Sequence, residues 1–261
     1  YIYINAEANL SADRIQRSID EASSHGLLGN NILDSGFCLY LEVRRGAGGY
    51  VCGEETTLIN TMEGYRREPR LKPPFPTEQG YLGKPTVINN CETLASVPFI
   101  LSKGPQEFST IGSDKATGTK IISLSGSVQR PGLAEVPMGT TLRDIVEDIG
   151  GGPKSGHVLT AIAVGGPSSG VFPPSMLDTP IGPGLLHESG VMLGAGGVIV
   201  IDERTGIGEV VRTLAAYNAA ESCGKCTPCR EGTPRIVDAI DRLMSINASA
   251  ADMDELRHLA D

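Results

Sequence analysis

Residues 221–233 form the most informative stretch of the chain and read Glu-Ser-Cys-Gly-Lys-Cys-Thr-Pro-Cys-Arg-Glu-Gly-Thr. Cys223, Cys226 and Cys229 follow one another with two residues between each pair. Three thiols this close cannot all pair as disulfides, and the spacing is typical of the ligands of a [4Fe–4S] cluster. A structural zinc site is the alternative, although zinc ligands usually come in two separated pairs. The sequence therefore predicts a metal site at these cysteines.

The residues around the three cysteines suit a cluster. Gly224 lets the backbone fold closely around it, and Lys225 and Arg230 offset its negative charge. No fourth cysteine follows, and His258, the one nearby downstream candidate, lies in a terminal helix where a histidine is usually solvated. The other cysteines are predicted to be buried small hydrophobic side chains: Cys38, Cys52 and Cys91.

The cysteines lie between two predicted helices. From Gly206 onward, apolar residues recur with helical spacing in three stripes, over 210–215, 236–243 and 253–259. We therefore expect a helical domain over residues 205–261.

Residues 116–204 have the pattern of a small mixed α+β domain. Alternating or apolar runs predict strands, and a Gln-Arg-Pro-Gly hairpin turn follows the first of them and leads into another strand. Thr140 or Thr141 then caps a short helix that stops at three glycines. The strands are expected over 119–128, 158–164 and 198–202, and the helix over 142–149.

Residues 1–115 have the pattern of an α/β domain. Strands are predicted at 1–4 and 38–43, with a helix over 11–22 between them that Ser11 or Asp13 caps. A second helix is predicted over 54–63. A third follows Asn90, with apolar positions at Leu94, Val97 and Leu101.

A glycine-rich turn, residues 45–53, precedes the helix that begins near Glu54. Free N–H groups and the positive end of the dipole at a helix start suit a phosphate or a flat cofactor ring. The chain contains neither the G-x-G-x-x-G fingerprint nor a P-loop. Glu54 and Glu55 could equally be ordinary first-turn carboxylates, so ligand binding and simple capping both stay open.

Two further segments carry candidate binding residues. The loop 71–76, Leu-Lys-Pro-Pro-Phe-Pro, holds a cation and an aromatic ring among prolines that stiffen the backbone. An ordinary surface loop is the alternative there. Asn89 and Glu92 have the spacing of a capping box, so structural capping is the default interpretation at Asn89-Asn90.

The composition excludes several classes of protein. Of 261 residues, 40% are hydrophobic, which argues against disorder, and the net charge of −9 with no basic stripe argues against a nucleic-acid partner. No apolar run approaches the ~20 residues of a membrane span, so direct membrane insertion is not expected, and no signal peptide opens the chain. The chain starts without Met inside a strand and stops inside a helix, which we interpret as a fragment cut at both ends.

Together, four motifs resemble the NADH-binding flavoprotein subunit of respiratory complex I, the 51 kDa subunit. The same family includes the diaphorase subunits of NAD-linked hydrogenases and formate dehydrogenases. The motifs occur in order at 45–57, 69–76, 89–98 and 221–233. The resemblance covers essentially the whole chain.

The resemblance implies three domains: the C-terminal part of a Rossmann-like FMN- and NADH-binding domain at 1–115, a ubiquitin-like β-grasp (SLBB-type) domain at 116–204, and a truncated helical iron–sulfur domain at 205–261. It implies that Gly53, Glu54, Asn89, Asn90 and Thr93 line FMN, and that Tyr50 and Glu55 face FMN and NADH. Lys72 and Phe75 are expected to meet the nucleotide, Phe75 by stacking on adenine. Glu54 and Glu55 are the expected catalytic carboxylates, as hydrogen-bonding and potential-tuning groups rather than general acids.

The resemblance also implies an activity. NADH passes a hydride to FMN, and single electrons go on to a [4Fe–4S] cluster held by Cys223, Cys226 and Cys229 and then to a thioredoxin-like [2Fe–2S] subunit and other electron-transfer subunits. We expect a cytoplasmic location, peripheral to a membrane complex where there is one. From the resemblance we expect the family's upstream glycine-rich FMN segment before Tyr1 and its fourth cluster cysteine beyond Asp261. The alternative is a non-catalytic scaffold module with structural zinc.

Overall fold

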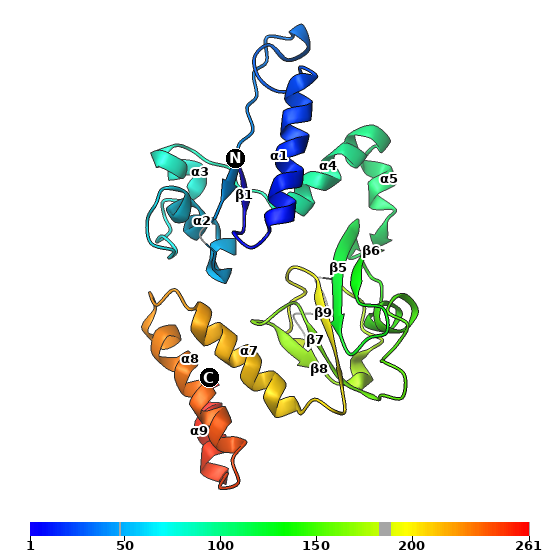
Figure 1. The fold of residues 1–261 in the computed structure, drawn as a ribbon, viewed down its shortest axis with the longest axis vertical. Helices are drawn as coiled ribbons and strands as arrows, with labels where there is room; N and C mark the ends of the chain where they lie inside the picture. The colour runs from blue at the N-terminus through cyan, green and yellow to red at the C-terminus, as the bar shows by residue number, and fades with distance from the viewer. Residues whose placement is uncertain (47, 183–188, 261) are drawn as a thin grey trace. The chain divides into compact units, whose positions relative to one another are not determined.

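The computed structural model describes residues 1–46, 48–182 and 189–260. The chain divides into two compact units (Figure 1). The first comprises Tyr1–Asn89 and Glu221–Arg230, and the second comprises Asn90–Ala220 and Glu231–Asp261. The segment with the three cysteines therefore belongs to the same unit as the glycine-rich turn, although more than a hundred residues separate them in sequence.

A parallel β-α-β arrangement opens the first unit. Strand β1 (Ile2–Ile4) pairs with β2 (Val43–Arg45), and helix α1 (Asn9–Ser24) lies between them in sequence. The predicted cap of α1 is wrong, because the helix starts earlier and its N-cap is Ala8, which has no side-chain acceptor. The strand predicted over 38–43 is also misplaced: β2 starts where the predicted strand ends, because regular pairing with β1 begins only there.

The rest of the first unit consists of short helices and loops, as the many glycines and prolines predict. Helix α2 (Glu55–Met62) matches the predicted helix over 54–63. The other elements are one-turn helices: η1 (Ile32–Asp34), η2 (Tyr50–Gly53), α3 (Pro76–Gln79) and η3 (Tyr81–Gly83).

The second unit begins with helices α4 (Cys91–Lys103) and α5 (Pro105–Ser109) and a small hairpin of β3 (Gly112–Ser113) and β4 (Ala116–Thr117). Asn90 rather than Asn89 caps α4, with its side-chain oxygen accepting from the N–H of Glu92. The predicted apolar positions of α4 do not form a buried stripe, since Leu94, Val97 and Leu101 are all exposed.

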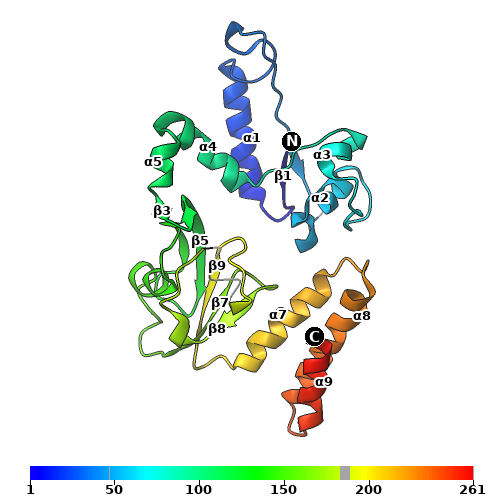
Figure 2. The same ribbon diagram turned by 180° about the vertical axis from the view of Figure 1, so that it is seen from behind.

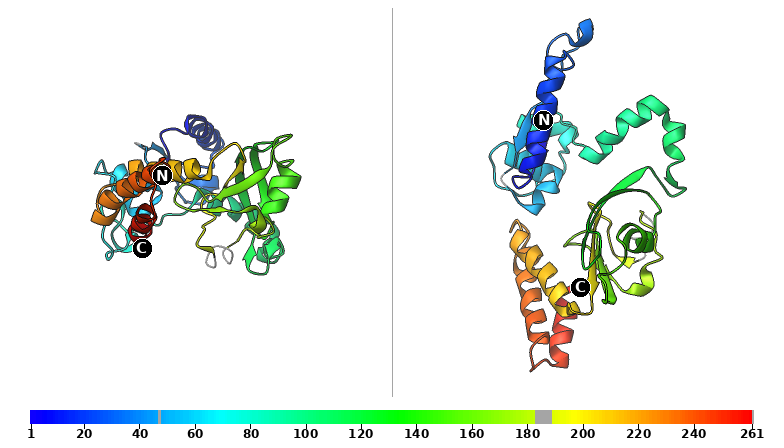
Figure 3. Two further views of the ribbon diagram at one scale, coloured as in Figure 1. Left: turned by 90° about the horizontal axis from the view of Figure 1, so that it is seen from below. Right: turned by 45° about the vertical axis from the view of Figure 1, so that its right-hand side comes forward.

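A five-stranded mixed sheet forms the centre of the second unit, in the order β6-β5-β9-β7-β8. The central strands β5 and β9 are parallel, and the other neighbouring strands are antiparallel. In chain order this is 2-1-5-3-4, and the sheet curves around the short helix η4 (Figure 3, right). This is the expected β-grasp architecture. The elements are β5 (Thr119–Gly126), β6 (Gly132–Pro137), η4 (Asp144–Ile149), β7 (Leu159–Val164), β8 (Gly170–Phe172), η5 (Pro174–Met176) and β9 (Gly197–Asp202).

The main core lies on the face of the sheet that packs against η4. Alternate residues of β5 point into it, so that Ile122 and Leu124 are buried while Ile121 is half exposed. Ile145 and Val146 of η4 are completely buried against them. A smaller cluster lies outside this core, where Ala161, Ala163 and Ile201 pack with Val210 of the following helix.

Three helices follow the sheet, as the apolar stripes predict: α7 (Ile207–Glu221), α8 (Thr227–Leu243) and α9 (Ala250–Ala260). Helices α7 and α8 lie side by side (Figure 2), and Arg212 of α7 forms an ion pair with Asp241 of α8. Arg242 of α8 forms ion pairs with Asp252 and Glu255 of α9. Within the described parts of the chain, no helix combines the length and apolarity that a membrane crossing requires.

The two neighbouring isoleucines of β5 provide a test of this core. Ile122 is fully buried, whereas Ile121 keeps 47% of its surface exposed. We expect Ile122→Ala to lower the free energy of unfolding by about 2–5 kcal/mol, because it removes buried methyl groups and leaves a cavity. Ile121→Ala is the matched control and should lower the free energy of unfolding by clearly less than Ile122→Ala does. Equal shifts of the urea unfolding midpoint would contradict the assignment of the two faces.

Candidate functional site

The glycine-rich turn keeps its backbone open on one side. Gly48 and Gly49 have φ angles of +86° and +105°, which residues with side chains rarely adopt. A Cβ atom added to Gly48 or Gly53 would meet no atom within 4 Å. At Gly49, in contrast, a side chain would overlap the guanidinium of Arg67. The turn therefore presents bare backbone at Gly48 and Gly53, to which a flat or charged ligand can come close.

Glu54 is the N-cap of α2. Of the two roles that the sequence leaves open for it, capping and ligand binding, the structure shows capping. Its Oε2 accepts hydrogen bonds from the N–H of Thr57 at 2.8 Å and from the hydroxyls of Thr56 and Thr57 at 2.6 and 3.0 Å. Burial raises the pKa of Glu54, but these hydrogen bonds outweigh it and bring the pKa down to about 2. Glu54 is therefore a fixed negative charge at the helix start, which does not itself exclude a ligand beside it.

Lys72 joins the two carboxylates that the sequence singles out. Its ammonium pairs with Glu55 and lies 3.4 Å from Oε1 of Glu54. The hydrogen bond that it donates to Glu55 raises the pKa of Lys72. Three of the predicted site residues, Glu54, Glu55 and Lys72, thus form one connected ionic group next to Gly53.

The two aromatic candidates are exposed. Tyr50, in η2, and Phe75, the residue before α3, keep about half of their surfaces accessible. The backbone of Phe75 is fixed, since its N–H donates to Glu78 at 2.9 Å and its carbonyl accepts from the N–H of Glu78. A rigid backbone carrying an exposed ring suits stacking on a nucleotide base.

The remaining predicted flavin residues are divided between the two units. Asn89 closes the first unit, and Asn90 and Thr93 lie at the start of the second. The side chains of all three residues are exposed. The Asn90 side chain caps α4 as described above. The structure therefore brings together the group around Gly53 within the first unit, whereas Asn90 and Thr93 belong to the second unit.

The three cysteines lie around the N-terminus of α8. Cys223 and Cys226 precede the helix and Cys229 is in its first turn, with Cys226 and Cys229 exposed. Gly224 has the left-handed φ of +76°, as its predicted role requires. Arg230 folds back onto the carbonyl of Gly224 at 2.8 Å. Exposed thiols at a helix N-terminus, next to a folded-back arginine, suit an anionic cluster.

The prediction that the other cysteines are buried is correct for one of them. Cys52 is buried, and its thiol donates to the carbonyl of Gly48 at 3.5 Å. Cys38 and Cys91 are exposed, because they belong to a loop and to the first turn of α4 rather than to a packed strand or stripe.

Contacts within the first unit link the cysteine segment to the loop that follows α2. Arg66 donates to the carbonyl of Cys223 at 3.4 Å, and Lys225 donates to that of Pro69. Glu221 lies 3.8 Å from Arg67 and accepts from the N–H of Tyr50 at 2.8 Å. Sequence reasoning missed the roles of Arg66, Arg67 and Glu221. The only signal was that Glu221 begins the cysteine motif.

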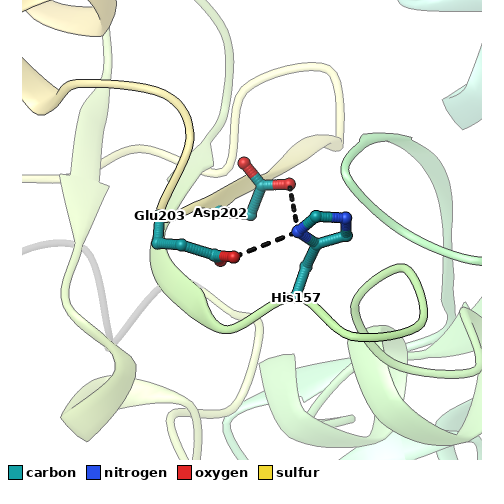
Figure 4. A group of neighbouring side chains, drawn as sticks. All are labelled: His157, Asp202 and Glu203. Carbon is teal, nitrogen blue, oxygen red and sulfur yellow. Dashed lines mark hydrogen bonds and ion pairs between the residues drawn. The ribbon is translucent and has the colours of Figure 1, made fainter.

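A second group of metal-ligating residues occurs in the second unit (Figure 4). His157, Asp202 and Glu203 hold one ligand atom each within 4.8 Å of one another. Their atoms already have partners: the His157 ring lies 3.0 Å from Glu203, and Asp202, which is buried, pairs with Arg204 at 2.6 Å. The Arg204 hydrogen bond lowers the pKa of Asp202 to about 2. The group fastens the end of β9 to the segment before β7.

A cavity of about 660 Å³ lies elsewhere in the second unit, between the β-grasp sheet and α7. Its lining includes Ala163, Ile199 and Val210, and none of the predicted site residues contributes to it. The candidate residues Tyr50, Phe75, Cys226 and Cys229 lie exposed on loops and at helix starts.

Three family models match the chain in the order of its predicted domains. The Nuo51 FMN-binding domain matches residues 1–99, the SLBB domain matches residues 121–172, and the NADH-ubiquinone oxidoreductase-F iron-sulfur binding region matches residues 209–261. The resemblance inferred from the four motifs is confirmed.

Curated relatives and solved structures agree with these matches. The chain is 44% identical over its whole length to 53% of the NADP-reducing hydrogenase subunit HndC of Solidesulfovibrio fructosivorans. It is 43% identical, over 99% of its length, to 62% of the F 2 subunit of NADH-quinone oxidoreductase of Rhizobium meliloti. An NAD+-reducing [NiFe]-hydrogenase in the H2-reduced state matches with a TM-score of 0.85 and 34% identity, over 98% of this chain and 42% of that chain.

The chain spans between about half and three-fifths of the length of these curated relatives. Along the chain, the FMN-binding model matches first, the SLBB model second and the iron–sulfur model third. On these matches, the chain belongs to the family that contains the F subunits of NADH-quinone oxidoreductases and the corresponding subunits of hydrogenases.

Proposed function

We propose that this chain is part of a flavoprotein subunit that oxidises NADH and delivers electrons one at a time to partner proteins. FMN, when bound, supplies the conversion between a hydride pair and single electrons, which a side chain cannot supply. The observation that carries the proposal is the position of the cysteine segment. It belongs to one compact unit with the glycine-rich turn, and it contacts Tyr50 of that turn and Arg66 of the loop after α2.

The residues of the first unit have separable tasks in this proposal. The bare backbone at Gly48 and Gly53 admits the flavin, with Glu54 as its fixed anionic neighbour. Tyr50, Glu55 and Lys72 orient the nicotinamide nucleotide, and the exposed ring of Phe75 stacks on adenine. Asn89, Asn90 and Thr93 complete the flavin site, and Cys223, Cys226 and Cys229 hold the [4Fe–4S] cluster.

The proposed domains are the FMN and NADH domain over 1–115, the β-grasp domain over 116–204 and the helical iron–sulfur domain over 205–261. The matched family models over 1–99, 121–172 and 209–261 support this division. As partners we propose a thioredoxin-like [2Fe–2S] subunit and further electron-transfer subunits of a larger complex in the cytoplasm. The relatives named for hydrogenases and for NADH-quinone oxidoreductases support such an assembly.

The competing function is a non-catalytic scaffold with a structural zinc at the three cysteines. Purified holoprotein separates the two functions by its metal content and colour. Broad visible absorption with iron, acid-labile sulfide and FMN supports the redox function, as does bleaching of the flavin by NADH. A colourless protein with stoichiometric zinc would reject it.

Replacing Phe75 tests the nucleotide site. Stacking of a base on an aromatic ring is worth about 1–3 kcal/mol, so we expect Phe75→Ala to weaken NADH binding about 5- to 150-fold. FMN content should stay unchanged, since the ring is assigned to adenine. Tyr65, another exposed aromatic residue of the first unit, is the control, and Tyr65→Ala should leave NADH binding unaltered. Loss of FMN with unchanged NADH kinetics would contradict the assignment.

The protonation of Glu54 tests whether it can act as a general acid. Since its pKa in the folded protein is about 2, we expect it to stay ionised throughout the pH range of activity. Because the pKa is lowered on folding, the stability that this carboxylate contributes is present above pH ~4.5 and is lost as the pH falls towards 2. A carboxyl NMR titration that compares the protein with Glu54→Gln measures this directly. A midpoint near pH ~6 would make Glu54 a proton donor instead.

Replacing Cys226 tests the cluster. In Cys226→Ser we expect flavin reduction at saturating NADH to persist, because that step needs no thiolate, whereas electron delivery to the partner should collapse. Stopped-flow bleaching of the flavin and low-temperature EPR of the reduced protein measure the two effects. Cys38→Ser, at an exposed cysteine outside the motif, should keep the normal EPR signal. A normal signal in Cys226→Ser would show that Cys226 is not a ligand.

A further inference from the structure

Glu221 connects the cysteine segment to the glycine-rich turn through its side chain. It is the last residue of α7 and begins the cysteine motif. Its Oε2 accepts the backbone N–H of Tyr50 at 2.8 Å, and only 26% of its side-chain surface is exposed. A hydrogen bond from a backbone N–H to an ionised carboxylate is among the stronger kinds in proteins. Tyr50 is thus held by a residue 171 positions away in sequence.

Arg67 holds the two preceding residues of the same turn. Its guanidinium lies 3.8 Å from the Glu221 carboxylate and donates to the carbonyl of Gly48 at 3.5 Å. It also occupies the space where a side chain at Gly49 would lie. Glu221 and Arg67 together therefore fix three successive residues of the turn, Gly48, Gly49 and Tyr50. Two of these are glycines with left-handed φ angles, and a glycine backbone without such contacts has wide conformational freedom.

The cysteine segment is itself attached to the loop that carries Arg67. Arg66 binds the carbonyl of Cys223, and Lys225 binds that of Pro69. A displacement of the cysteine segment consequently acts on the turn through Glu221 and on its neighbouring loop through these two contacts. Hydrogen bonds and an ion pair thus connect the two segments, and networks of this kind can carry energetic coupling between sites.

We propose that Glu221 is a positioning residue that makes the conformation of the turn 48–50, and with it the affinity for the nicotinamide nucleotide, depend on the state of the cysteine segment. The inference rests on the proposed function, which assigns Tyr50 to the flavin and nucleotide site and the cysteines to the cluster. It adds a coupling between the two sites. A coupled pair of sites typically changes affinity about 5- to 150-fold.

Hydrogen exchange at the Tyr50 amide measures the position of the turn without any ligand. We expect Glu221→Ala to accelerate exchange of this amide about tenfold or more, since it removes a charge-assisted hydrogen bond that protects the amide. Glu221→Gln should restore much of the protection, because its amide oxygen still accepts the N–H. Glu209→Ala, at an exposed glutamate in the first turn of the same helix, is the matched control and should leave exchange unchanged.

A double-mutant cycle with NAD+ as the probe measures the coupling in the holoprotein. We expect Cys226→Ser to change the NAD+ dissociation constant in the protein that keeps Glu221. In the Glu221→Ala variant, which itself binds NAD+ about tenfold more weakly, the same replacement should have little further effect. Independent, additive effects of the two replacements would overturn the coupling.

The outcomes also separate this inference from the proposed function. A parent protein that neither binds NAD+ nor contains a cluster rejects the proposed function. Hydrogen exchange at the Tyr50 amide then decides by itself whether Glu221 positions the turn. Unchanged Tyr50 protection in Glu221→Ala overturns the inference even where NAD+ binding and the cluster are both found. The inference is supported if Cys226→Ser lowers the protection of the Tyr50 amide in the protein with Glu221 but not in the Glu221→Ala variant.

Discussion

Carboxylates that accept backbone N–H groups from distant segments hold much of this protein together. Glu221 binds the N–H of Tyr50, and three other glutamates do the same elsewhere: Glu63 at Leu82, Glu92 at Ile121 and Glu203 at Val158. A chain with 33 glycines and 17 prolines has long stretches outside regular ladders, where N–H groups need other partners. The hydrogen bond from His157, and after it the one from the N–H of Val158, lowers the pKa of Glu203. Burial raises the pKa of Glu92, but the hydrogen bonds from the N–H of Ile121 and from Lys120 outweigh it and lower that pKa. Protonation of Glu92 or Glu203 at low pH should therefore weaken these two attachments.

The two units rely on different forces. The second has a continuous apolar core between the β-grasp sheet and η4, with many side chains completely buried. The first has few buried apolar residues, and its loops depend on ion pairs and on side-chain hydrogen bonds to the backbone. The aromatic rings of Tyr50 and Phe75 stay exposed in this unit and add little to a buried core. Hydrogen bonds to Glu54 and Glu221 stabilise the local backbone where few apolar side chains are buried.

The sequence alone determined the features that follow from local patterns of residues: most helices, several strands and the four motifs. Periodicity located α2, the three helices of the C-terminal region and three strands of the β-grasp sheet to within a few residues, since alternation and helical spacing reflect one buried face. The strand expected after the hairpin turn is β6, although its bounds were not predicted. The strand at 38–43 was misplaced, and the short β8 was not predicted. Four motifs in order indicated the family, and the spacing of Cys223, Cys226 and Cys229 indicated a metal site.

Tertiary structure alone decided which distant groups meet. No local pattern shows that Glu221 reaches Tyr50, that Arg67 fills the space beside Gly49, or that Lys72 pairs with both neighbouring glutamates. It also decided that Glu54 caps its own helix as a fixed charge, and that two of the isolated cysteines are exposed. The physical reason is common to all these cases. Burial and hydrogen bonding at a residue depend on what the folded chain places around it, and sequence spacing carries that information only within a single helix or strand.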